Sequence, residues 1–181
     1  MRLTDIRADA TQIDRAEGAW AEARPAPLIC RTPSSDRFRK LAATAAEMIN
    51  ASIAFVTIVG RNVHSINGRL GLHLRGSAIE RVVRLHHLAM GGKLVISDLS
   101  KDGRTRNLPC VTDFPCLRFY AGVPIIVGGR TVGTLAITDR SPRPDGLWLH
   151  ESAALSGFAA CASRLWDTPG SDVSVQPAPR P

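Results

Sequence analysis

Residues 118–139, RFYAGVPIIVGGRTVGTLAITD, constrain the fold most, because they predict a β-hairpin with two poor strand formers inside it. Two apolar runs are separated by Gly128 and Gly129, which favour a tight turn. Gly122 and Pro124 nevertheless lie in the middle of the first run. A glycine lets another backbone, a side chain or a ligand come close, and a proline cannot donate to a ladder. We therefore expect a crowded position at Gly122 and a bulge or local break in pairing at Pro124.

The rest of the chain predicts an α+β domain with an antiparallel sheet. Before the hairpin the order is helix, strand, strand, helix, strand and loop, and one helix follows it. These elements cover residues 37–50, 52–59, 63–68, 77–90, 93–98, 99–117 and 147–166. Both alternating sets of residues in 52–59, SIAFVTIV, are apolar, so this strand is expected to be covered on both faces. The order of elements indicates the α+β class.

The hairpin motif also carries a resemblance to a known family. FYAGVPI, a glycine-containing turn and VGTLAITD, preceded by KLVISDLSKDGR, resemble the C-terminal half of a GAF domain. The resemblance covers roughly residues 36–166. It implies a GAF-like antiparallel sheet with helices packed on one face and a roofed small-molecule cavity on the other. Gly122 then lies at the cavity, or it only makes room for a large core neighbour such as Phe55.

The length of 181 residues suits one domain with extensions at its ends. We expect an N-terminal helix over 1–24, a proline-containing linker over 25–35, the GAF-like domain over 36–167 and a disordered tail over 168–181. No apolar run approaches the ~18 residues that a membrane span needs, and the N-terminus does not read as a signal peptide. The sequence therefore predicts a cytoplasmic protein without membrane contact.

The positive charge of the chain is concentrated in one segment. The formal net charge is +7, and between Arg61 and Arg106 nine Arg or Lys residues stand against three acids. This segment has no aromatic residue to stack on bases and no nucleic-acid-binding motif, so we expect no nucleic-acid partner. The cations form either a solvated basic face or a rim that attracts anions. In the second case Arg84 or Arg104 would bind a carboxylate or phosphate.

His86 falls on the apolar face of the helix predicted over 77–90. An imidazole in that position is a core residue, a ligand contact or a metal ligand. His86 joins two arginines of the basic segment and two residues of the hairpin as candidate ligand-binding residues. They are Arg84, His86, Arg104, Tyr120 and Gly122. We expect no catalytic residue and no metal ligand.

The four cysteines lack the spacing of a metal site and read as free thiols: Cys30, Cys110, Cys116 and Cys161. Cys110 and Cys116 lie just before the hairpin, where neighbouring arginines could lower a thiol pKa. A thiol-redox enzyme, similar to the GAF-family methionine sulfoxide reductases, is therefore one alternative, although the cysteine arrangement of that branch is not matched.

No cofactor follows from the family resemblance. Bilin-binding members attach their pigment through a Cys-His pair, and the corresponding positions in this chain are Asn107 and Leu108. The dispersed motif of members that bind cyclic nucleotides cannot be traced. The cofactor stays unknown.

The sequence predicts a non-enzymatic sensory or regulatory GAF module that binds a small ligand, with an anion as the favoured class. A ligand-free interaction or dimerisation module is the alternative. We expect a signalling-protein partner or a homodimer built on the terminal helices. Apolar stripes support the dimer: Ile6, Ile13 and Trp20 in the first helix, and Trp148, Leu155 and Phe158 in the last. These two helices could instead cover one another and the sheet within a monomer.

Overall fold

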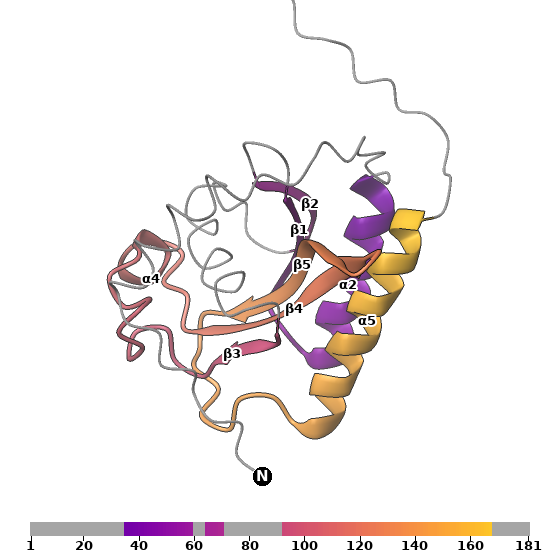
Figure 1. Ribbon diagram of the computed structural model, residues 1–181. Helices are drawn as coiled ribbons and strands as arrows, with labels where there is room; N and C mark the ends of the chain where they lie inside the picture. The colour runs from indigo at the N-terminus through magenta and orange to yellow at the C-terminus, as the bar shows by residue number, and fades with distance from the viewer. Residues whose placement is uncertain (1–34, 60–63, 71–91, 168–181) are drawn as a thin grey trace, which may run out of the picture.

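The computed structural model describes residues 35–59, 64–70 and 92–167 (Figure 1). The helices in this part of the chain are α2 (Ser35–Ile49), α4 (Pro109–Thr112) and α5 (Leu149–Asp167). The strands are β1 (Ile53–Val59), β2 (His64–Leu70), β3 (Leu94–Ile96), β4 (Phe119–Val127) and β5 (Arg130–Asp139). The predicted α+β class is confirmed. The helix predicted over 77–90, the N-terminal helix, the linker and the tail lie outside the described residues.

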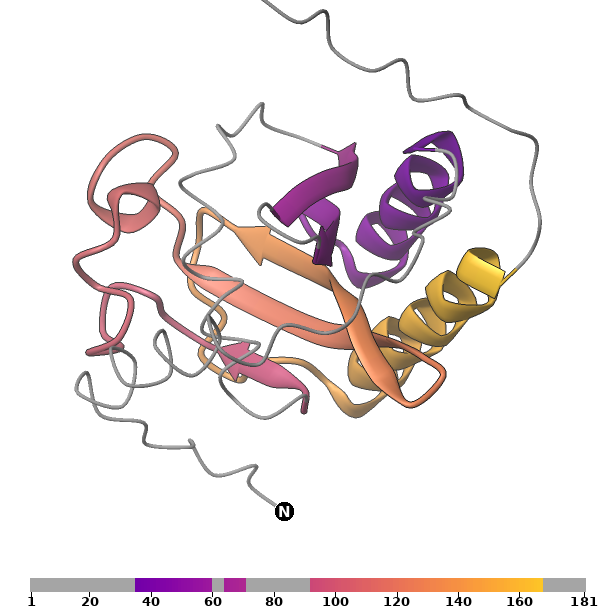
Figure 2. The ribbon, with the colours of Figure 1, turned by 45° about the horizontal axis from the view of Figure 1, so that its top comes forward.

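The five described strands form one antiparallel sheet in the order β2-β1-β5-β4-β3. Its centre is the pairing of β1 with β5, which runs from Ile53 opposite Thr138 to Ile58 opposite Gly133. The predicted hairpin is β4 and β5, which pair from Phe119 opposite Asp139 to the turn. Figure 2 shows the twist of this sheet and the two long helices beside it. β1, near the start of the described chain, therefore pairs with β5, which lies much later in the sequence, in the middle of the sheet.

Helices α2 and α5 lie side by side, in opposite directions, on one side of the sheet, which we call the helix face (Figures 1 and 2). The buried residues of α2 recur every three or four positions: Phe38, Ala42, Ala45, Ala46 and Ile49. They share one core with Ala54, Val56, Leu135 and Ile137 of the sheet and with Leu155, Ala159 and Ala162 of α5. The expected helical layer is therefore present.

The apolar stripe of α5 is divided between the core and the surface. Leu155 is fully buried on the helix face, and Phe158 packs against the same core. Trp148, just before α5, and Leu149, its first residue, are 63% and 88% exposed. Leu155 therefore cannot form part of the expected dimer seam, because the core of its own chain already buries it.

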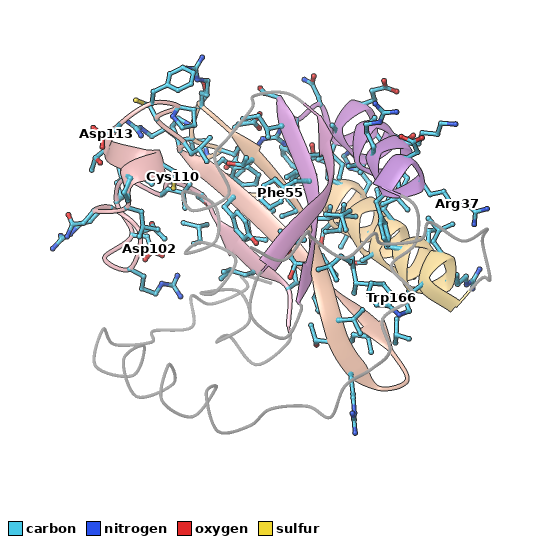
Figure 3. The ribbon with its side chains drawn as sticks, turned by 90° about the horizontal axis from the view of Figure 1, so that it is seen from above. Arg37, Phe55, Asp102, Cys110, Asp113 and Trp166 are labelled. Carbon is cyan, nitrogen blue, oxygen red and sulfur yellow. The ribbon has the colours of Figure 1, made fainter. Side chains whose placement is uncertain are left out.

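The opposite side of the sheet, which we call the loop face, is partly covered by residues 98–118. Figure 3 shows α4 and its flanking loops on the other side of the sheet from α2 and α5. A second core lies between them: Ile53, Phe55, Leu94, Ile96, Leu99, Cys110, Val111, Leu117, Tyr120 and Ala136. β1 thus contributes to both cores, as its apolar alternation predicts.

The short length of β3 explains why β4 tolerates a proline. Among the described strands, β3 pairs with Tyr120, Ala121 and Gly122, so Pro124 lies beyond the end of β3 and no described strand pairs with it on that side. A proline is tolerated there because no donor is required. Pro124 itself stays paired with Thr134 of β5, so the bulge or break in pairing expected at Pro124 is not found at that residue. The irregularity in the β4–β5 register falls just after it, between Ile125 and Ile126.

Arg143, in the loop between β5 and α5, ties both long helices to the sheet. Its Nε donates to Asp139 Oδ2 at 2.8 Å, and its guanidinium lies 3.5 Å from Glu151 Oε1 in the first turn of α5. It also donates to the backbone oxygens of Ile49 at 3.3 Å and Asn50 at 2.8 Å, where α2 ends. The last carbonyls of a helix have no partner within the helix, so this side chain satisfies them.

Candidate ligand-binding site

Gly122 lies on the loop face in the middle of the sheet. It is opposite Leu94 on one side and Ala136 on the other. Its neighbours Ala121 and Val123 belong to the core on the helix face, so Gly122 and Tyr120 share the loop face. The glycine is buried. Short residues therefore occupy two adjacent positions on this face.

Tyr120 lies two residues before Gly122 on the same face of β4, and it is opposite Ile96 and Thr138. Its side chain is 1% exposed and belongs to the second core. Burial raises the pKa of the Tyr120 hydroxyl far above its usual range, so it is protonated at neutral pH. Tyr120 thus contributes a neutral, largely apolar surface beside the glycine.

Arg104 lies in the loop between β3 and α4, where Asp102 engages its guanidinium. Its Nε is 2.9 Å from Asp102 Oδ1, and its backbone N–H donates to the same oxygen at 2.9 Å. Burial alone would raise the pKa of Asp102, but the hydrogen bonds and the charge of Arg104 lower it overall. The positive charge of Arg104 is therefore matched within its own loop.

The other described cations of the basic segment are partly engaged as well. Lys93 Nζ donates to the backbone oxygen of Ser152 at 3.2 Å and contacts the hydroxyl of the same residue. Lys101 lies 3.6 Å from Asp98. Arg84 and His86, two of the expected site residues, lie outside the described residues. The anion-attracting rim stays a prediction.

The two cysteines near the site differ in exposure. Cys110 is buried in the second core, and burial raises the pKa of its thiol to about 11. Cys116 is exposed, in a backbone conformation with φ of 59°. A thiol with a raised pKa is a weak nucleophile at neutral pH, because the thiolate is the reactive form. Cys110 is therefore poorly suited to nucleophilic chemistry.

The structure adds two threonines that were not among the expected site residues. Thr57 of β1 is opposite Thr134 of β5, and both are buried. Thr134 lies two residues before Ala136 on the same face of β5. Thr57 Oγ1 donates to the backbone oxygen of Thr134 at 3.4 Å. Within the described part of the chain, the Thr134 hydroxyl itself has no hydrogen-bond partner. The alternation in TLAIT contained this signal, since Thr134, Ala136 and Thr138 share one face.

A known domain family matches most of the chain. The GAF domain model matches residues 34–165. A cyclic di-GMP phosphodiesterase of Pseudomonas aeruginosa is 28% identical over 107 residues, which are 59% of this chain and 18% of the relative. The chain therefore spans less than a fifth of that curated relative.

Solved structures show the same fold at low sequence identity. A type II free methionine-R-sulfoxide reductase from Thermoplasma acidophilum has a TM-score of 0.60 and 13% identity, over 73% of this chain and 91% of that one. The GAF domain of a phosphoenolpyruvate-protein phosphotransferase from Coxiella burnetii has a TM-score of 0.60 and 16% identity, over 85% and 90%. These likenesses establish the fold alone.

Proposed function

Because the chain belongs to the GAF domain family, we propose that it is a sensory or regulatory module that binds a small ligand on the loop face of its sheet. Domains of this family are commonly sensory or regulatory. The observation that carries the proposal is the adjacent pair of Gly122 and Ala136 in the middle of that face, between Phe55 and Leu94. Both positions are buried, and their short side chains let whatever covers them come close to the backbone.

We propose further that the module is not an enzyme. Cys110, one of the two thiols considered for redox chemistry, is buried and has a raised pKa. No group of three or more metal-ligating side chains occurs among the described residues. The likeness to a methionine sulfoxide reductase, at 13% identity, concerns the fold.

An anionic or strongly polar ligand is the class that the charge of the sequence favours. The excess of Arg and Lys between residues 61 and 106 supports it. The pairing of Arg104 with Asp102 and of Lys101 with Asp98 reduces that excess in the described part. Arg84 and His86 therefore stay the main candidate contacts for the charged part of a ligand.

The output of the module would pass through a partner protein or a dimer. The match to part of a cyclic di-GMP phosphodiesterase supports a place in signalling, but the chain covers only 18% of that protein. Location in the cytoplasm belongs to the same proposal. None of the described helices is long and apolar enough to cross a membrane.

A ligand-free interaction module is the second candidate function. Trp148 and Leu149 favour it, since both are large, apolar and exposed at the start of α5. Along the rest of α5 the exposed residues include Ala153, Gly157 and Ala160, which would allow another helix to come close. The same surface could serve the dimer of the first candidate.

Thermal denaturation with a compound panel tests the proposal. Nucleotides, organic acids and amino acids are added at low salt, and the unfolding midpoint of each mixture is measured. A true ligand at a hundred times its dissociation constant stabilises the fold by about 2.7 kcal/mol, which raises the midpoint of a domain of this size by roughly 5 to 11 °C. No shift with any compound, together with methionine sulfoxide reductase activity that disappears in Cys110→Ser or Cys116→Ser, would contradict the proposal.

A further inference from the structure

Lysine is rare in this chain, and its three lysines differ in their surroundings. They are Lys40 in α2, Lys93 just before β3 and Lys101 in the loop after β3. Lys40 is exposed, and the Lys101 side chain is 84% exposed and lies 3.6 Å from Asp98. Lys93 is half-buried, and its side chain reaches α5. Of the three lysines, Lys93 is therefore the one whose amine is partly withdrawn from water.

Neutral oxygens hold the amine of Lys93 in the described structure. Its Nζ donates to the backbone oxygen of Ser152 at 3.2 Å and contacts the hydroxyl of the same serine. No carboxylate among the described residues lies within ion-pair distance of Lys93. The serine thus fixes the position of the amine without supplying a counter-charge.

The charged groups nearest to this contact in the sequence are engaged elsewhere or exposed. Glu151, which precedes the serine in α5, lies 3.5 Å from the guanidinium of Arg143. His150, in the same helical turn, is exposed to solvent. Asp98, in the turn after β3, pairs with Lys101. Within the part of the chain that the structure describes, these groups leave the amine without an ionic partner.

An amine in these surroundings is a better nucleophile than an ordinary surface lysine. Burial lowers the pKa of the Lys93 ammonium, because neutral oxygens do not replace the water that the charge loses. A larger share of the amine is then uncharged at neutral pH, and only the uncharged form has a lone pair that can attack a carbonyl carbon. The side chain is half-buried rather than enclosed, so a small reagent can still reach Nζ.

We propose that Lys93 is a modification site, whose amine is acylated by an activated acyl donor, either an acyl phosphate or an acyl thioester. Nζ forms a bond to the acyl carbon, the bond from that carbon to oxygen or sulfur breaks, and phosphate or thiolate leaves with the electron pair. The proton that Nζ loses passes to water. The product is an uncharged amide with one N–H in place of three, so it cannot hold both oxygens of Ser152 as the ammonium does.

The first experiment compares the three lysines within the wild-type protein. The folded full chain is incubated at neutral pH with acetyl phosphate in one arm and acetyl-coenzyme A in the other, and mass spectrometry measures the acetylation rate of each lysine. In at least one arm Lys93 should react several-fold faster than Lys40 and Lys101, and that arm identifies the class of donor. The urea-unfolded chain is the control, in which the three rates should become nearly equal.

The second experiment changes the charge beside the amine. Ser152→Asp places a carboxylate where the hydroxyl lies, which favours the ammonium form, so the rate at Lys93 should fall several-fold towards that of Lys101. Ser152→Ala removes the hydroxyl without adding a charge, and Lys93 should stay the fastest-reacting lysine. The rate at Lys40 should be the same in both variants and in the wild type.

Three results would overturn the inference: no acetylation in either arm, a rate at Lys93 no higher than at the two exposed lysines, or a rate at Lys93 that the folded Ser152→Asp variant leaves unchanged. If that variant does not fold, the comparison of the three wild-type lysines decides by itself, because it needs no substitution.

Discussion

Gly133 shows, at the scale of one residue, how little room separates β1 from β5. A Cβ atom at this position would lie 2.2 Å from the backbone oxygen of Thr57. The contact is with backbone rather than with the end of a flexible side chain, so the strands themselves would have to move. A glycine here is required by the close approach of two strands, directly beside the threonine pair of the candidate site.

Gly133→Ala should therefore destabilise the protein by about 1 to 3 kcal/mol through overpacking. Urea denaturation gives the free energy of unfolding. Gly103→Ala is the control, because Gly103 lies in the loop after β3 with nothing within 4 Å of its Cβ position. That variant should change the free energy of unfolding by at most about 0.5 kcal/mol. Equal effects of the two substitutions would contradict the described register of β1 and β5.

Cys110 predicts a loss of stability at alkaline pH. Burial raises the pKa of its thiol from 9.0 to about 11 in the folded protein. Below pH 9 the thiol is protonated in both states, and between pH 9 and 11 only the unfolded chain ionises, so stability falls as the pH rises. Urea midpoints measured from pH 7 to 11 should fall less steeply in Cys110→Ala than in the wild type. Parallel pH profiles would show that the thiol is not buried.

Single positions were predicted from the sequence only in part. Gly122 was recognised because a glycine inside a strand is unusual, and the structure places it on the loop face between Leu94 and Ala136. Thr134 was missed because threonine is an ordinary strand residue. Its significance depends on whether its hydroxyl has a partner, and that is decided by residues distant in the sequence. The pairing of Arg104 with Asp102 depends on the shape of a loop that periodicity does not specify.

Between elements, Arg143 is the main polar connection in the described structure. It joins Asp139 at the end of β5, Glu151 in α5 and the last carbonyls of α2. Its side chain is only 19% exposed and that of Asp139 is 9% exposed, so solvent screens their interaction weakly. The positions of both long helices relative to the sheet therefore depend on one side chain.

Arg143→Met should destabilise the protein by about 3 to 5 kcal/mol, because it leaves buried Asp139 without its counter-charge. The matched control is Arg39→Met, since Arg39 pairs with Asp36 on the surface of α2 with both side chains more than half exposed. That change should alter the stability by at most about 1 kcal/mol. Losses of the same size in the two variants would show that Arg143 is not a structural connection.

The sequence predicted the order and type of the helices and strands better than it predicted the contacts between them. Local periodicity, which each segment carries by itself, predicts the hairpin, the helical layer and the burial of β1 on both of its faces. Helix α4 was expected only as a loop or broken helix, since PCVT has no amphipathic pattern to indicate it. The burial of Leu155 was not separable from dimerisation, because an apolar stripe is the same whether it faces its own sheet or a partner.

For the whole molecule, we predict a homodimer that uses the exposed surface of α5. Ala153→Glu places a charge on this surface without touching the core, because Ala153 is exposed. Sedimentation at tens of micromolar should show a dimer for the wild type and a monomer for Ala153→Glu. Arg37→Glu, on the exposed side of α2, should stay dimeric. A monomeric wild type would contradict the predicted homodimer.

Native mass spectrometry of the protein purified from its own host tests the central claim, that this GAF domain binds a small molecule, most directly. We predict a mass above that of the polypeptide, with the excess lost on denaturation because the molecule is held without a covalent bond. The released compound, added back, should raise the unfolding midpoint of the wild type. A mass equal to that of the polypeptide alone, together with a panel in which no compound shifts the midpoint, would contradict a ligand-binding role.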